Sequence, residues 1–136
     1  MSIIDKGDYL EYYDKTDQDT RAEKYHQVDS NSWITYTYPS WLVWHTKNEG
    51  KKTIGEAVQD QQAGVKKGVS DILILTGFIG CKYAFIAIEL KRANKKGTKV
   101  SQEQKEFLRR VRECGGFAAV CYGFNQVKKA IEDATK

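Results

Sequence analysis

The sequence has little of what marks several large protein classes. It contains three cysteines and one proline in 136 residues. An odd cysteine count without a Cys-x-x-Cys pair disfavours both a disulfide framework and a zinc site. No stretch approaches the roughly 18 apolar residues of a transmembrane helix, so no membrane association is expected. The acidic N-terminus has no apolar signal core, so we expect a cytoplasmic protein, including the case of a phage protein acting in its host.

What remains is a chain sized for a single domain with its own core, over residues 1–136. The formal net charge is +4 and the sequence pI is about 8.9. A mildly basic balance is compatible with nucleic acid as a partner, but weak evidence alone. The scarcity of proline and of low-complexity segments argues against disorder.

Hydrophobic periodicity predicts alternating helices and strands. A polar helix is expected over about 8–28, and further helices start after the capping residues Thr53 and Ser101 and near Gln126. Ile54, Ala57 and Val58 would be core residues of the second helix. Strands are expected over 33–38, 41–45, 72–75, 83–90 and 117–122. This order predicts an α/β fold with a mixed central sheet covered by helices.

The most informative feature is a set of charged residues at the ends of two apolar strands. A hairpin loop centred near Gly80 would place Asp71 opposite Glu89, with Cβ atoms about 4.5–5.5 Å apart. Glu89 and Lys91 are two residues apart and point to one face. Two close carboxylates need a cation between them, and a hard divalent ion such as Mg²⁺ is the natural candidate. A slip of one residue would send the carboxylates to opposite faces.

Three segments in order carry a resemblance to a known family. They are Gly68-Val69-Ser70-Asp71, Ile88-Glu89-Leu90-Lys91, and Ser101 to Gln104 at the start of the clearest helix. Together they resemble the VRR-NUC family of the PD-(D/E)xK nuclease superfamily, which shares the restriction-endonuclease core. The family pattern usually has a proline where this chain has Ser70, which removes no ligand.

The resemblance implies a nuclease that depends on Mg²⁺ or Mn²⁺ and needs no organic cofactor. Asp71, Glu89 and the main-chain carbonyl of Leu90 would hold the metal, and Lys91 would orient water or stabilise charge on the phosphate. Gln104 would position the water or Lys91 and also cap its helix. Glu23 is the best match to an early-helix glutamate of the family, with Glu11 as the alternative.

Basic residues next to these positions are candidates for binding DNA phosphates. They are Arg92, Lys95, Lys96, Lys99, Lys105 and Arg109, with Arg112 at the same helical spacing. Small stand-alone members of the family resemble junction resolvases and act as homodimers. The resemblance therefore implies a homodimeric, structure-selective endonuclease on branched DNA such as a four-way junction.

Other readings remain open at this stage. A catalytically silent DNA-binding module would keep the fold, and a restriction-type enzyme would cut a fixed sequence. His45 and Asn48 are expected on the surface or in the core rather than in the cleft, and His26 on a helix surface. Trp33, Trp41 and Trp44 are expected in the core or at a dimer interface rather than stacked on bases.

Overall fold

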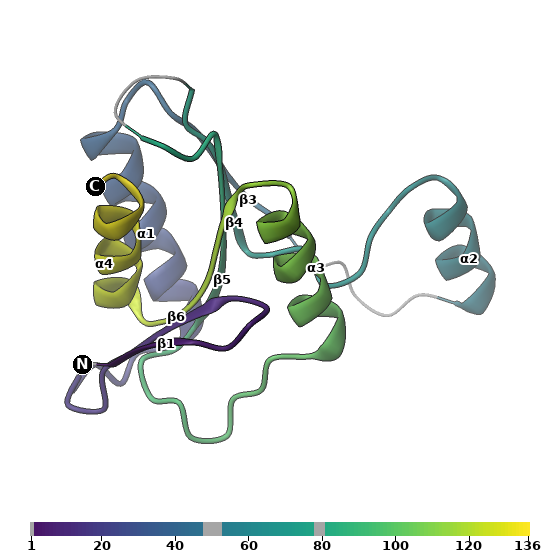
Figure 1. Cartoon of the computed structure of the whole chain (residues 1–136). Helices are drawn as coiled ribbons and strands as arrows, with labels where there is room; N and C mark the ends of the chain where they lie inside the picture. Colours follow the sequence, from purple (N-terminus) through teal and green to yellow (C-terminus); the bar gives the residue numbers. More distant parts are fainter. Residues whose placement is uncertain (1, 48–52, 78–80) are drawn as a thin grey trace.

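A computed structural model describes residues 2–47, 53–77 and 81–136, and its elements alternate between strands and helices along the chain (Figure 1). The strands are β1 (Ser2–Asp5), β2 (Leu10–Tyr13), β3 (Leu42–His45), β4 (Ile72–Leu75), β5 (Phe85–Lys91) and β6 (Phe117–Tyr122). The helices are α1 (Glu23–Thr37), α2 (Ile54–Gln62), α3 (Gln102–Glu113) and α4 (Phe124–Ala134). The expected strands at 41–45, 72–75, 83–90 and 117–122 are therefore confirmed, to within a few residues at their ends.

The strands form one six-stranded mixed sheet in the order β1-β2-β6-β5-β4-β3. β2, β6 and β5 run parallel to one another. The pairs β1–β2, β5–β4 and β4–β3 are antiparallel. The central strands are apolar because both of their faces are covered by helices. The predicted α/β class with a mixed, helix-covered sheet is confirmed.

Each face of the sheet has its own hydrophobic cluster. On one face, α1 and α4 pack through Ile34, Val127 and Ile131 onto strand residues such as Ile88. On the other face, α3 packs through Leu108 and Val111 onto residues that include Val120. Figure 1 shows α1 and α4 side by side and α3 across the sheet from them. None of the helices in the described ranges is long and apolar enough to cross a membrane.

The β4–β5 hairpin has the register that the sequence predicted. Ile72 pairs with Ile88, and the pairing continues to Leu75 and Phe85. One step further along the same register places Asp71 opposite Glu89. The residues around Gly80, on which the loop was centred, lie outside the described residues.

The N-terminal third differs from the prediction. Leu10 to Tyr13 form a strand inside the expected helix of 8–28, and the expected strand of 33–38 lies in α1. The residues that α1 buries are His26, Ser30 and Ile34, which are spaced by four. Two of these three are polar, so the buried stripe of the helix is invisible to a hydrophobic pattern.

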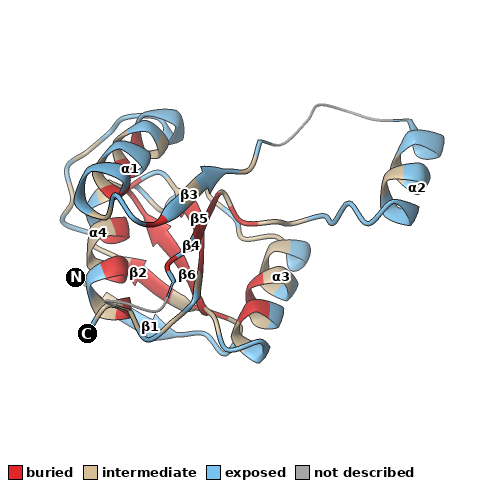
Figure 2. Ribbon diagram, turned by 90° about the horizontal axis from the view of Figure 1, so that it is seen from above, coloured by how far each residue is buried: buried red, intermediate tan, exposed pale blue. Residues whose placement is uncertain are grey.

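The expected core role of α2 is wrong. Thr53 caps the helix as predicted, accepting a hydrogen bond from the Glu56 amide, and the helix ends at Gln62. It buries no residue, and Ile54 and Val58 are exposed. Figure 2 shows α2 projecting away from the sheet and its covering helices.

Candidate active site

Three predicted site residues meet at the corner where β4 begins and β5 ends. They are Asp71, Glu89 and Lys91, called the D…ExK residues below. Glu89 lies near the end of β5 and its side chain is almost fully buried, with 4% exposed. The Lys91 ammonium lies 3.7 Å from the Glu89 carboxylate. Asp71 immediately precedes β4 and accepts a hydrogen bond of 2.8 Å from the Leu90 amide. Two carboxylates and one ammonium therefore converge in a nearly dry corner.

Burial dominates the electrostatics of Glu89. The pKa of Glu89 is raised to about 9, chiefly by removal from water and next by a hydrogen bond to Asp71. The repulsion of the Asp71 charge acts in the same direction, and Lys91 opposes it. Without a cation the Glu89 carboxyl therefore keeps its proton well above the usual range of a glutamate.

The main-chain amide and carbonyl of Leu90 lie on the side of β5 that faces β4 and Asp71. The Gly123 amide donates to the Lys91 carbonyl, so the Lys91 carbonyl points toward β6. Successive residues of a strand alternate in the side to which they direct their polar groups. The Leu90 amide and carbonyl therefore both face the β4 side, where the amide meets Asp71.

Gln104 reaches the site from the first turn of α3. Its side-chain amide donates to Glu89 at 3.1 Å, while its oxygen accepts from the Ser101 amide at 2.9 Å. The Ser101 hydroxyl accepts from the Gln104 amide, which completes a capping box. Gln104 thus caps its helix and contacts Glu89, whereas its expected role in positioning a water or Lys91 stays a prediction.

Gly68 allows the segment before Asp71 to lie directly on that helix turn. Its φ is +76°, and a Cβ there would lie 2.3 Å from the Glu103 carbonyl carbon and 2.6 Å from the Gln104 nitrogen. No side chain fits in this space. The next buried residue, Ser70, has a hydroxyl without a hydrogen-bond partner among the described residues.

Glu23 and His45 face the same corner from two other elements. Glu23, the first residue of α1, is exposed at its surface, but partial removal from water and the Asp71 charge raise its pKa, while Lys91, His45 and Arg92 oppose the rise. His45 ends β3, and its Nδ1 lies 2.9 Å from the Asp71 carbonyl oxygen. Sequence reasoning placed His45 away from the cleft, and only its position at the end of a strand hinted otherwise. Asn48 lies outside the described residues.

The basic residues around the site fall into two groups. Arg92, Lys96 and Lys99 are exposed on the loop after β5, and Lys105 is half-buried on α3. The others hold internal ion pairs: Lys95 with Glu11 at 2.7 Å, Arg109 with Glu106 and Glu113, and Arg112 with Asp5. Lys95 also lies over the rings of Tyr13 and Tyr122, so its ammonium faces the protein. Glu11, the alternative to Glu23, is occupied by this pair.

The expectation that His26 lies on a helix surface is wrong, since it is buried and accepts a hydrogen bond from the Phe124 amide. Trp41 is buried and stacks on Tyr38 with ring centroids 3.9 Å apart, as expected for a core residue. Trp33 packs against the same cluster, whereas Trp44 is exposed on the edge strand β3.

The oxygen atoms at the corner suit a small, hard cation. Asp71 and Glu89 supply carboxylates, and the Leu90 carbonyl faces the same side; such ligands are the ones that Mg²⁺ prefers. Within the described residues there is no group of three His, Cys, Asp or Glu side chains arranged to hold a metal. Mg²⁺ commonly binds through one or two carboxylates and completes its shell with water and phosphate oxygens, so the residues present fit it.

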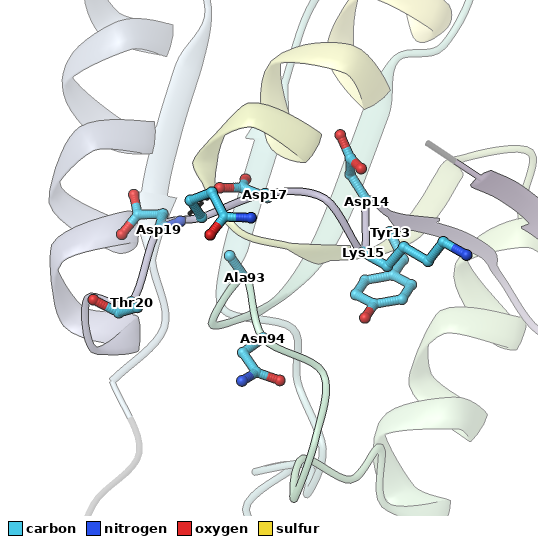
Figure 3. A pocket seen from close by; sticks show the side chains of 9 residues that line it. Tyr13, Asp14, Lys15, Asp17, Asp19, Thr20, Ala93 and Asn94 are labelled. Carbon is cyan, nitrogen blue, oxygen red and sulfur yellow. Dashed lines mark hydrogen bonds between the residues drawn. The ribbon is translucent and has the colours of Figure 1, made fainter.

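A separate hollow of about 270 Å³ lies between the loop that follows β2 and residues Ala93 and Asn94 (Figure 3). Its carboxylates serve local turns: Asp14 accepts from Thr16, and Asp19 accepts from Arg21. This acidic hollow is unsuited to a phosphate.

Comparison with known proteins agrees with this geometry. No curated protein matches the sequence. A solved structure described as a VRR_NUC domain protein has a TM-score of 0.60 and 21% identity, over 85% of this chain and 89% of that one. A second, described as a VRR_NUC domain, has a TM-score of 0.46 and 19% identity, over 79% and 95% of the two chains. The VRR-NUC domain family matches residues 20–125, which include Glu23, Asp71, Glu89, Lys91 and Gln104, and the chain belongs to this family of nucleases.

Proposed function

We propose that residues 1–136 form one VRR-NUC domain that hydrolyses DNA phosphodiester bonds with Mg²⁺ or Mn²⁺, preferentially on branched DNA such as four-way junctions. The observation that carries the proposal is the meeting of Asp71, Glu89 and Lys91 in one buried corner. A buried carboxylate pair is costly unless a cation neutralises it, and a purely structural role would not require it.

The roles of the side chains follow from their contacts. Asp71, Glu89 and the Leu90 carbonyl would hold the metal, which when bound supplies Lewis acidity and a more acidic water. Lys91, 3.7 Å from Glu89, orients the attacking water or stabilises charge that develops on the phosphate. Gln104 holds one Glu89 oxygen and so orients the carboxylate. Glu23 would accept a hydrogen bond from a water at the mouth of the corner.

The cations beside the corner that form no ion pair among the described residues would bind the DNA backbone. Arg92, Lys96, Lys99 and Lys105 can contact phosphates directly. Arg109 would have to leave its ion pairs with Glu106 and Glu113, which are exposed and therefore weak. Lys95 would act indirectly, by holding the loop to Glu11.

A homodimer is part of the proposal, because branched DNA offers two strands to two sites. Exposed apolar residues on edge strand β3 and its neighbour support it: Leu42 pairs with Leu75, and Trp44 lies beside them. The projecting α2 adds Ile54 and Val58. Sedimentation of wild type and Trp44→Ser would show whether this edge forms the contact; equal dimerisation of both would exclude it.

The test of the activity is cleavage of a labelled four-way junction and a matched linear duplex with Mg²⁺, Mn²⁺ or EDTA. Wild type is compared with Glu89→Gln, which keeps the shape of the side chain but removes its charge. Glu103→Gln is the matched control, since Glu103 is an exposed glutamate in the first turn of α3. Metal-dependent cutting of the junction that Glu89→Gln abolishes and Glu103→Gln retains is the expected result.

Other results would select the alternatives. Cutting of both substrates alike would keep the nuclease and reject the preference for branched DNA. Cutting only of duplexes with a particular sequence would indicate a restriction-type enzyme. Tight binding without cutting under any metal would indicate a silent DNA-binding module.

A further inference from the structure

A lysine-lined hollow of about 400 Å³ lies on the same face of the sheet as the D…ExK corner. Glu89 on β5 and Glu11 on β2 both pair in register with Val120 on β6. Residues in register on neighbouring strands point to the same face, and each step between strands is about 4.8 Å. Glu11, in the wall of the hollow, is therefore about 10 Å from Glu89 at the same level of the sheet.

The charges lining this hollow favour an anion. Lys6, Lys99 and Lys105 contribute to its wall and have no ion-pair partner among the described residues. Glu11 is neutralised by Lys95 at 2.7 Å, so Asp8 is the remaining acidic group in the lining. The acidic hollow of Figure 3, by contrast, gathers three aspartates.

Two tyrosines and a threonine also line the hollow. Tyr9 and Tyr122 line it with little exposed surface, 5% and 3%. The Thr98 hydroxyl, which donates to the Lys95 carbonyl, forms part of the rim. Because the ion pair of Lys95 with Glu11 holds this loop onto β2, Lys99 is positioned before any ligand arrives.

We propose that this hollow binds a phosphate group of the same nucleic-acid strand whose scissile phosphate lies at Asp71 and Glu89. The proposal rests on the proposed nuclease function and adds a second contact point on the strand. Lys6 is the informative residue: it lies in the turn between β1 and β2, far in sequence from every residue of the D…ExK pattern.

The test measures the affinity for a labelled DNA strand in EDTA, where no cutting occurs, over a range of salt concentrations. Lys6→Gln is compared with Lys82→Gln. Lys82 is an exposed lysine beside the β4–β5 turn, at the opposite end of the hairpin from Glu89. For a single strand, loss of one phosphate contact reduces the slope of log K against log salt by about 0.7, which is roughly a fivefold weaker affinity at 0.1 M salt relative to 1 M.

The expected result is that Lys6→Gln and Lys99→Gln lose this contact while Lys82→Gln keeps it. Equal salt slopes for Lys6→Gln and Lys82→Gln would overturn the hollow as a phosphate site, even if Glu89-dependent cleavage is intact. A wild type that neither binds nor cuts DNA would instead overturn the nuclease function itself. Strands with and without a 5′-phosphate separate the two sources: equal losses assign an internal phosphodiester, and a loss confined to the phosphorylated strand assigns a terminal phosphate.

Discussion

Gly68→Ala tests whether the close approach of the segment before Asp71 to α3 organises the site. The added Cβ would lie 2.3 Å from the Glu103 carbonyl carbon, and the backbone φ of +76° already disfavours any side chain. Because the obstacle is helix backbone, relief requires the segment and the first turn of α3 to move apart. That movement would separate Gln104 from Glu89.

The expected loss of folding stability in Gly68→Ala has two parts. A left-handed backbone costs an alanine about 1–2 kcal/mol, and forcing atoms into a filled space typically costs about 1–3 kcal/mol more. Gly77→Ala is the matched control, because its φ is +81° and no described residue lies within 4 Å of its Cβ position. The control should therefore lose only the first part.

The assays are thermal unfolding and metal-dependent cleavage at a temperature where both variants are folded. Each kcal/mol corresponds to roughly 3–5 °C in Tm for a domain of this size. We expect Gly68→Ala to unfold several degrees below Gly77→Ala, and to cleave more slowly while folded. Equal Tm values and equal rates for the two variants would refute the reasoning.

Three further predictions concern buried groups. The unfolded Glu89 carboxyl ionises near 4.5, but the folded one holds its proton to about 9, so the metal-free protein should lose stability as pH rises through that window. Melting curves in EDTA should show this fall for wild type and a flatter profile for Glu89→Gln. Lys95→Met, which leaves the buried Glu11 unpaired, should cost about 3 kcal/mol in denaturant unfolding, whereas Lys96→Met should leave stability unchanged; equal effects would exclude the pair as a brace. Ser70→Ala removes a buried hydroxyl that has no hydrogen-bond partner among the described residues and should raise the Tm, corresponding to about 1 kcal/mol; a lower Tm would indicate an unseen partner.

The meeting of Asp71 and Glu89 could be predicted because the sequence patterns that determine it are local. The β4–β5 register follows from two apolar runs joined by a short loop, and the Ser101–Gln104 capping box lies within one turn. Placing Asp71 against Glu89 needs only that hairpin. The contact of Gln104 with Glu89 needs one further step, the packing of α3 on the sheet.

The parts that escaped prediction depend on distant contacts. β2 is a strand because Leu10 to Tyr12 pair with β6, more than a hundred residues later in the chain. Lys95 and Lys96 are adjacent and chemically identical, yet only Lys95 meets the buried Glu11. No local pattern separates such neighbours, because the deciding partner lies on another strand.

The position of Glu23 depends on His26, a residue that none of the motifs contains. His26 lies three residues after Glu23 and is buried against the start of α4. Its Nδ1 accepts a hydrogen bond of 2.9 Å from the Phe124 amide. Gly123 cannot cap α4 with a side chain, so the imidazole satisfies one of the free amides of that helix end. This contact joins α1 to the turn that follows β6, and the Gly123 amide in that turn donates to the Lys91 carbonyl. A buried histidine thus connects the helix that begins at Glu23 with the strand end that carries Lys91, which explains why both reach one corner despite lying far apart in the sequence.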